Sequence, residues 1–464
     1  MNTERSRIGH RKMTEGNIRT LILKFAAPTT VGMIVIALYS LADAYFVSEL
    51  GTSAGAAVGV TFAIQALLQA IGYTLGMGAG SLMSRCLGER KNEDATKYAM
   101  IAFFFSVASG LLVAVIGIVF GGPIIRLLGA TDSIYPYAMS YARYLFLSAP
   151  FACVTYVVSQ LLRAEGKVIY SMVGLASGSV LNIILDPILI KRLGLGISGA
   201  SLATLISQAV STLILLSAYI FPKDHIELFQ KIKLSDFRKI SSILFVGTPS
   251  AFRQGLTAVA TVMLNHAAAV WGDAAVAAIS VVTRLFLLAF SLCLGVGQGM
   301  MPVVGYNFGS QRHDRVRSAY SFSVLLSSAA MLTISIPALI WSSQLIAFFR
   351  NDPAVIAIGK NALRVQAIVF VLHGAITCTI MMLQAIGRPI AAAILACARQ
   401  GLFFFPLVFF LPSAFGIKAV IYVQPVADAL TFLLALPFLF TLLRNLQTSK
   451  EKAAKQSALR QIFR

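Results

Sequence analysis

Three polar side chains interrupt two long apolar stretches of this sequence. Asp43 lies in the stretch LYSLADAYFV, and Asn182 and Asp186 lie in VLNIILDP. A carboxylate in a membrane span costs about 2.5–3.5 kcal/mol on insertion scales, so it needs a polar partner or a water-filled cavity. Asn182 and Asp186 are four residues apart, which places them on one face of a helix. We predict that Asp43, Asn182 and Asp186 form one polar cluster.

Such a cluster has defined chemistry. Two carboxylates held close together in a low dielectric cannot both ionise at low cost, so the pair can take up a proton or bind a small cation. Asn182 would supply a carbonyl oxygen to a cation, and Thr204 would add a hydroxyl. A lipophilic cation would compete with the proton or the ion. Further side chains are expected to line the same cavity: Tyr39, Tyr141 and Gln160.

A different polar set lies in the second half of the chain. It comprises Arg253-Gln254, Arg399-Gln400 and Asp428. One interpretation is a buried structural bridge from Asp428 to Arg399 or to Arg253. The other is an anion site formed by the two arginines, because arginine suits carboxylate and phosphate recognition. His266 and His373 are expected to be packing residues.

The composition indicates a helical membrane protein that crosses the bilayer many times. The chain has 464 residues, of which 58% are hydrophobic and 12% are charged. Soluble domains have about 25% charged residues. Apolar runs of about 20 residues, the length that spans a bilayer as a helix, recur along the whole chain.

We predict twelve transmembrane helices from these runs. The expected spans are 20–46, 54–82, 96–120, 135–162, 169–190, 198–220, 242–270, 276–303, 318–341, 356–384, 390–412 and 417–443. Such ends carry an error of about 2–4 residues.

The charge distribution orients these spans. The net charge is +20, and most of the 38 Lys and Arg residues lie in the two tails and in alternate loops on one side. This is the positive-inside bias of membrane proteins, and it argues against a nucleic-acid partner. We predict a membrane protein with both termini in the cytoplasm.

The two halves of the sequence are repeats of one another at an offset of 221 residues. The matched pairs are Pro28 and Pro249, Gly51 and Gly272, Gly76 and Gly297, Gly78 and Gly299, and Gly88 and Gly309. Each half has six spans, so both halves enter the membrane from the same side, as parallel repeats do.

The repeat predicts two lobes with a cleft between them. The expected division is an N-lobe at 1–220, a cytoplasmic linker at 221–241, a C-lobe at 242–447 and a basic cytoplasmic tail at 448–464. The duplication places a two-fold arrangement within one chain, so we expect a monomer. Pro28 removes a helical hydrogen bond inside the first span and marks a candidate hinge.

The repeat also shows that the fold does not require the acids. The equivalents of Asp43, Asn182 and Asp186 in the second half are Leu264, Phe403 and Leu407. The polar cluster therefore belongs to the first half alone, which favours a functional role.

Three catalytic patterns do not occur in the sequence. HExxH, DDxxD and Walker motifs are missing, so we expect a transporter that is not an enzyme. The five cysteines have no metal-binding spacing and suit small buried positions. Neither a cofactor nor a firm metal site is expected.

At several motifs the chain resembles the multidrug and toxic compound extrusion (MATE) family. They are LAD at 41–43 with FV at 46–47, SR at 84–85 with LG at 87–88, LRAEG at 162–166, and NIILDP at 182–187 with GLGISGA at 194–200. GTPS at 247–250 with Arg253-Gln254, and RQG at 399–401 before Phe405-Pro406, resemble the DinF/MepA-like branch. The resemblance covers all twelve spans.

The resemblance implies a two-lobed bacterial exporter that expels organic cations and other amphiphilic drugs or dyes in exchange for H⁺ or Na⁺. It places Asp43, Asn182, Asp186 and Thr204 at the coupling-ion site of the N-lobe. Another branch has an acid near the position of Thr257, and its sodium site is not expected here. We favour H⁺ over Na⁺. The alternative is a translocator of a lipid-linked or anionic metabolite that uses the arginines of the C-lobe.

Overall fold

The computed structural model describes residues 10–220, 228 and 233–462, and within these ranges the fold is helical, without strands. The helices of the first half are α2 (Ile18–Ser48), α3 (Thr52–Gly88), α4 (Asn92–Leu127), α5 (Tyr135–Ala164), α6 (Val168–Pro187) with its π-helical end η1 (Ile188–Arg192), and α7 (Gly196–Ile220). Each predicted span of this half corresponds to one of them.

The second half repeats this order. Its helices are α8 (Lys239–Ala269), α9 (Asp273–Gly309), α10 (His313–Ile340), α12 (Pro353–Ala385), α13 (Pro389–Cys397) with η3 (Ala398–Leu402) and α14 (Phe404–Phe415), and α15 (Ile417–Ile462). Two short elements were not predicted, η2 (Leu234–Arg238) and α11 (Ser342–Phe349). Of the predicted linker, residues 221–227 and 229–232 lie outside the described residues. The predicted tail continues α15 as far as Ile462.

Eleven helices of the described part are long and apolar enough to cross a membrane. The remaining predicted span, at 242–270, corresponds to α8, which is 31 residues long but does not meet this criterion. It carries Arg253, Gln254, Asn265 and His266, which lower its hydropathy. Its position as the repeat equivalent of α2 is nevertheless clear from Pro249, which corresponds to Pro28.

Contacts divide the chain into two compact units. Unit 1 comprises residues up to 27, 84–92 and from 259 onward, and unit 2 comprises 28–83 and 93–258. The repeat alone predicts a boundary at residues 220–242 instead. The observed boundary differs from the predicted one because the first half of α8 packs against α3. There Gly247 lies against the carbonyl of Thr74. In α2 the boundary falls between Ala27 and Pro28.

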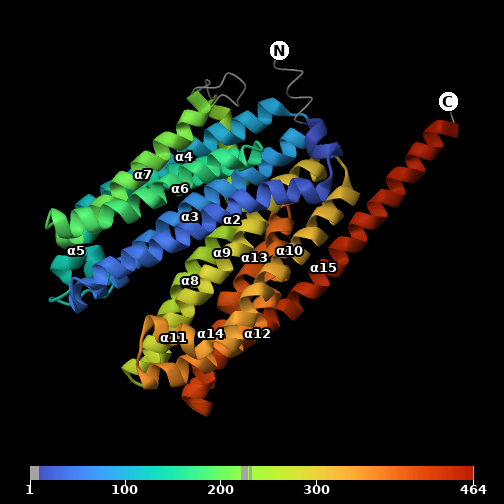
Figure 1. The fold of residues 1–464 in the computed structure, drawn as a ribbon. Coiled ribbons are helices and arrows are strands. Elements are labelled where there is room, and N and C mark those ends of the chain that lie inside the picture. The colour runs from blue at the N-terminus through green and yellow to red at the C-terminus, as the bar shows by residue number, and fades with distance from the viewer. Residues whose placement is uncertain (1–9, 221–227, 229–232, 463–464) are drawn as a thin grey trace. The chain divides into compact units, whose positions relative to one another are not determined.

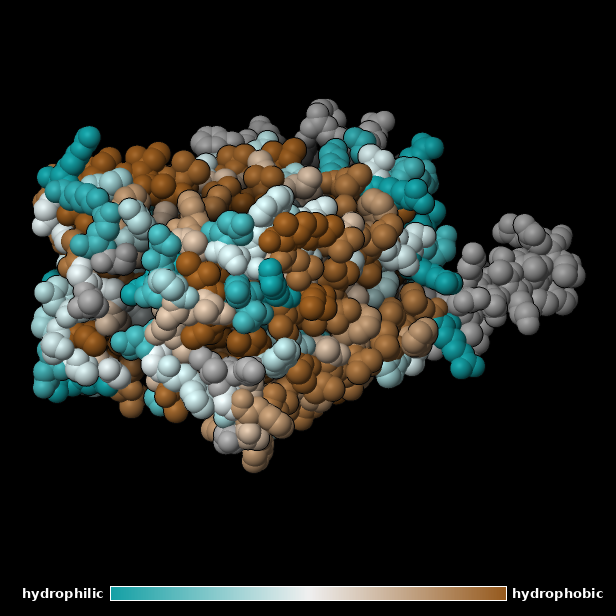
Figure 2. Space-filling view, turned by 60° about the horizontal axis from the view of Figure 1, so that its bottom comes forward, coloured by the Kyte–Doolittle hydropathy of each residue, from teal (hydrophilic) through white to brown (hydrophobic). Residues whose placement is uncertain are grey.

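Unit 2 is a bundle in which α5, α6 and α7 pack against one another (Figure 1). α5 lies at its centre, and most of its residues are buried. α4 instead exposes large apolar side chains, among them Phe104, Leu112, Val115 and Val119. Figure 2 shows hydrophobic side chains over broad areas of the surface. Large exposed apolar areas suit a protein that is surrounded by lipid.

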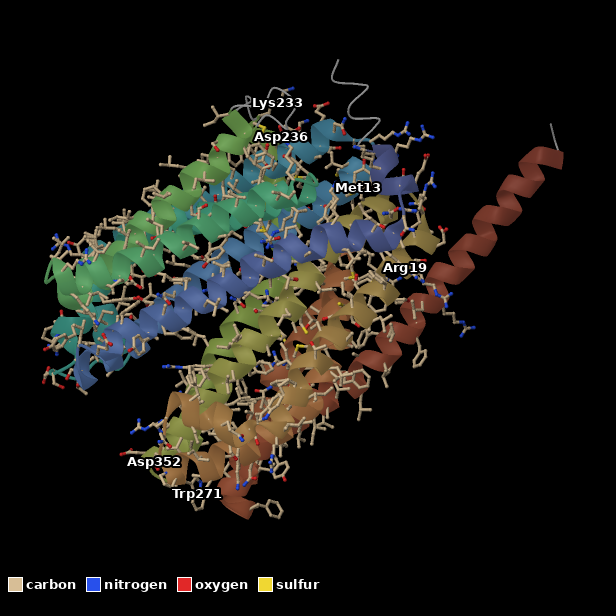
Figure 3. All side chains as sticks on the ribbon, viewed as in Figure 1. Met13, Arg19, Lys233, Asp236, Trp271 and Asp352 are labelled. Atoms are coloured by element: carbon tan, nitrogen blue, oxygen red, sulfur yellow. The ribbon has the colours of Figure 1, made fainter. Side chains whose placement is uncertain are left out.

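Unit 1 is a second bundle, in which α12 packs against α9, α10 and α15 (Figure 1). Its apolar core includes Phe286, Phe290, Met331 and Phe370. Met13 and Arg19 lie toward one end of this unit, and Trp271 and Asp352 lie at the other (Figure 3). At that second end Asp352 caps α12 by accepting a hydrogen bond from the N–H of Ala354 at 2.8 Å.

Candidate cation site in unit 2

The acids and amide predicted to cluster come from three helices of unit 2. Asp43 lies on α2, Asn182 and Asp186 lie on α6, and Thr204 lies on α7. All four side chains are buried, and Asp186 is fully enclosed. Asn182 lies beside Thr204, and Tyr39 of α2, one turn before Asp43, lines a cavity together with both of them. The structure therefore places α2, α6 and α7 around one polar region, as the sequence analysis expected.

Asn182 connects Asp186 to α7. Its amide satisfies both partners when its nitrogen donates to Oδ2 of Asp186 at 3.1 Å and its oxygen accepts from the backbone N–H of Thr204 at 3.2 Å. The spacing of four residues on α6 produces this contact, as expected. The amide thus turns a donor toward Asp186, whereas we had expected it to offer an oxygen to a cation.

Tyr141 contacts the acidic cluster directly. It is fully buried, and its hydroxyl donates to Oδ2 of Asp43 at 3.2 Å. Gln65 lies next to it, with Nε2 at 3.4 Å from the same hydroxyl. Gln160 packs against Gly76 of α3. Neither Tyr141 nor Gln160 lines the cavity described next.

A small cavity adjoins the cluster. Its volume is about 20 Å³, enough for one water molecule or a small ion. Tyr39, Asn182 and Thr204 line it, together with polar residues on the following turns of α7: Ser207, Gln208 and Ser211. The sequence analysis missed these three, although their spacing from Thr204 places them along one side of the helix.

Several buried oxygens around this cluster have no hydrogen-bond partner within the described residues. They are Oδ1 of Asp43, Oδ1 of Asp186, Oγ of Ser207 and Oε1 of Gln208. Buried polar atoms are nearly always satisfied, so these oxygens mark a place for water, a proton or a small cation. All four atoms are oxygens, the ligand type that suits hard cations such as Na⁺. Among the described residues no group of three or more His, Cys, Asp or Glu could hold a metal ion.

Arg253 and Gln254 lie in unit 2, although the repeat predicts them in the C-lobe. Arg253 donates to Oε1 of Gln254 at 3.2 Å, and its guanidinium lies 5.9 Å from the ring centre of Tyr73. Gln254 donates to Oε1 of Gln69 on α3 at 2.8 Å. These contacts place Arg253 beside Gln254 and Tyr73 within unit 2.

Asp428 pairs with Arg399 within unit 1. Its Oδ1 accepts from Nε of Arg399 at 2.9 Å and from Gln424 at 2.8 Å. Its Oδ2 lies 3.0 Å from Nε2 of His373 and accepts from Gln366 at 3.0 Å. This fully buried carboxylate has four partners, so its hydrogen-bonding capacity is filled.

The guanidinium of Arg399 is also enclosed by aromatic rings. It lies 5.1 Å and 5.0 Å from the ring centres of Phe286 and Phe290. The adjacent Gln400 is buried. The sequence analysis treated His373 as a packing residue and missed Gln366 and Gln424. Gln366 and His373 are two helical turns apart, and Gln424 is one turn before Asp428, which is the pattern that could have found them.

Known proteins resemble this chain along most of its length. The MatE family model matches twice, at residues 28–188 and 249–410. The two matches begin 221 residues apart, which confirms the internal repeat. The multidrug export protein MepA of Staphylococcus haemolyticus is 29% identical over 94% of this chain and 96% of its own length. The protein of the same name from Staphylococcus saprophyticus is 30% identical over 92% and 95%.

Solved structures share the fold. An outward-facing multidrug resistance MATE family transporter of the MOP superfamily has a TM-score of 0.87 and 27% identity, covering 94% of this chain and 98% of that one. A MATE structure in complex with MaL6 has a TM-score of 0.87 at 26% identity, covering 95% and 99%.

Proposed function

The chain belongs to the MatE family, and from this premise we propose that it is a secondary active multidrug exporter. It exchanges lipophilic, mainly cationic compounds for H⁺ by alternating access, acting as a monomer in the bacterial cytoplasmic membrane with both termini in the cytoplasm. The observation that carries the proposal is the buried pair of Asp43 and Asp186 with its unpartnered oxygens beside a water-sized cavity.

The arrangement of Asn182 favours H⁺ over Na⁺ in this proposal. Na⁺ would need several inward-facing oxygens. The oxygen of the Asn182 amide accepts from the backbone of Thr204, and its nitrogen faces Asp186. A proton requires only one free carboxylate oxygen, and both Asp43 and Asp186 have one.

The cationic preference follows from the same residues. An organic cation near the pair is attracted to ionised carboxylates, and protonation removes that attraction. Drug and proton then disfavour each other's binding, which is the reciprocal coupling that an antiporter needs.

The alternative, a translocator of an anionic or lipid-linked metabolite, needs arginines that can reach a ligand. Arg399 is instead neutralised by Asp428 and enclosed by Phe286 and Phe290. This arrangement fits a structural bridge better than an anion site.

Dye transport by purified protein in liposomes tests the proposal. A pH gradient and a sodium gradient are imposed separately, and movement of a fluorescent cationic dye is followed. We expect transport under the pH gradient only. Transport under the sodium gradient alone would reassign the coupling ion, and transport of an anionic probe in place of the dye would support the alternative.

A further inference from the structure

The residues before α2 form a short helical segment that lies against unit 1. Residues 10–15 are helical, and Gly16 and Asn17 separate them from α2. Asn17 caps α2 by accepting from the N–H of Arg19 at 3.0 Å. On the segment, Met13 and Thr14 are buried, whereas Arg11, Lys12 and Glu15 are exposed. One face of the segment is therefore packed against the protein. Figure 3 marks Met13 on it.

Arg315 of α10 holds the end of this segment. Its Nη2 donates to the carbonyl of Met13 at 3.2 Å and to the carbonyl of Gly16 at 2.7 Å. The last carbonyls of a helix lack intrahelical partners and carry partial negative charge, so a guanidinium is a fitting partner. The same side chain donates through Nε to Oδ1 of Asn307 at 2.9 Å. One arginine thus joins the segment, α9 and α10.

Asn307 and Tyr306 of α9 contact the segment directly. Nδ2 of Asn307 donates to the carbonyl of Met13 at 3.2 Å. Nδ1 of His10 lies 2.9 Å from the hydroxyl of Tyr306, and the two rings are in contact. The segment is therefore tied to the last turn of α9 through His10 and through the carbonyl of Met13.

That last turn of α9 crosses the end of α3. A Cβ on Gly88 would overlap the carbonyl oxygen of Tyr306, and a Cβ on Gly309 would overlap that of Arg85. Ser310 adds a hydrogen bond to the carbonyl of Gly88 at 2.9 Å. We call residues 84–88 and 305–310 the glycine crossing. The docked segment and the crossing share the residues Tyr306 and Asn307.

We propose that residues 10–17 form a latch that holds the glycine crossing closed and must undock before the ends of α3 and α9 can separate. The latch rests on the proposed function in one respect, because alternating access is what would require this separation. Arg315 is its positioning residue. Undocking would leave the carbonyls of Met13 and Gly16 to water and would free Asn307 and Tyr306.

Hydrogen exchange of the full-length protein in nanodiscs tests the latch without measuring transport. Arg315→Ala removes the guanidinium, and Lys12→Ala, on the exposed face of the segment, removes the same charge without a latch contact. Exchange is followed in peptides that cover residues 10–17 and in peptides that cover residues 84–88 and 305–310 of the crossing. We expect Arg315→Ala to speed exchange in all of these peptides by about tenfold, the factor that corresponds to about 1.4 kcal/mol. Lys12→Ala should match the wild type.

Two results would overturn the latch. In the first, exchange in residues 10–17 is the same in Arg315→Ala as in the wild type. In the second, that segment exchanges faster while the crossing is unchanged, which would make the segment a passive anchor. Thermal melting of each variant identifies a general loss of folding, and Arg315→Lys, which keeps one donor, should then show an intermediate exchange rate. Failure of dye transport in the wild type would reject the exporter and leave these exchange results as they are.

Discussion

Gly88 and Gly309 occupy equivalent positions in the two halves of the sequence, and each lies against the backbone of the other's helix. Gly88 faces the carbonyl of Tyr306, and Gly309 faces that of Arg85. Arg85 and Tyr306 are themselves equivalent at the offset of 221 residues. Ser84 and Gly305, another equivalent pair, also meet directly. Equivalent residues of the two repeats therefore face one another in this crossing, and the glycines are matched because a side chain would prevent the contact.

Adding a methyl group at either glycine should separate the helices. We expect Gly88→Ala and Gly309→Ala each to destabilise the protein by about 1–3 kcal/mol, the usual size of an overpacking effect. Gly59→Ala in the same helix as Gly88 is the control, because nothing lies within 4 Å of its added carbon. Thermal melting in detergent measures all three. Equal melting temperatures for Gly88→Ala and Gly59→Ala would contradict the tight crossing.

The order of the helices could be predicted from the sequence because apolar length and charge bias are local signals. The grouping of helices into units could not. A repeat shows which segments share an origin, but Gly247 of the second half packs against Thr74 of the first. The same packing of α8 against α3 places Arg253 beside Tyr73, in the unit that contains the acids.

The bridge between Asp428 and Arg399 should be structural. Asp428→Asn leaves a buried guanidinium without its counter-charge, and such changes cost about 3–5 kcal/mol. We expect a large fall in melting temperature, with dye transport per folded molecule little changed. Transport that is lost in a protein of unchanged stability would instead give Asp428 a direct role.

Removing both charges should restore stability. Because the double variant Asp428→Leu with Arg399→Met leaves no unpaired charge, it should be more stable than Asp428→Asn alone. The comparison is made by thermal melting under identical conditions. A double variant that is less stable than the single one would show that the partners Gln366, His373 and Gln424 dominate the cluster.

The latch should respond to pH through His10. Burial of the docked ring, with Arg90 and Arg312 nearby, lowers the pKa of His10 below 6.5, and Glu15 opposes this weakly. Tyr306 is its hydrogen-bond partner. The docked form thus binds the proton less readily than the undocked form. Docking is then strongest above pH 6.5 and weakens as the pH falls below it.

Exchange protection of residues 10–17, corrected for the intrinsic effect of pH, measures this response. Protection in the wild type should fall on acidification through pH 6.5. In His10→Gln, which retains a hydrogen-bonding group but does not titrate in this range, protection should stay constant. The same pH response in both proteins would exclude His10 as its source.

Tyr141 should support the function of Asp43. Tyr141→Phe removes the hydroxyl that donates to Oδ2 of Asp43 and should cost about 1 kcal/mol of stability. We expect dye transport at saturating dye to fall several-fold as the carboxylate loses its orientation. Tyr137→Phe, one turn earlier on α5 and exposed, is the control. Unchanged transport in Tyr141→Phe would show that Asp43 does not depend on this contact.

The candidate site was predictable where spacing within one helix determines a contact. Asn182 and Asp186 meet because they are four residues apart on α6. Contacts between helices were not predictable in the same way: Tyr141 reaches Asp43 across 98 residues of sequence. Gln208 and Ser211 could be recognised as site residues only from the structure, in which they line one cavity with Asn182. Hydroxyls and amides are common on packed membrane helices, so their type alone does not identify a site.

The central claim is that Asp43 and Asp186 exchange a proton for a cationic drug. The most direct measurement is proton release when a cationic dye binds to purified protein in weakly buffered detergent solution. We predict release of about one proton per dye bound by the wild type, as reciprocal coupling requires. Asp132→Asn, which changes an exposed acid, should release the same number, whereas Asp43→Asn and Asp186→Asn should release few or none. Undiminished release by both of these variants, with dye binding intact, would contradict the account.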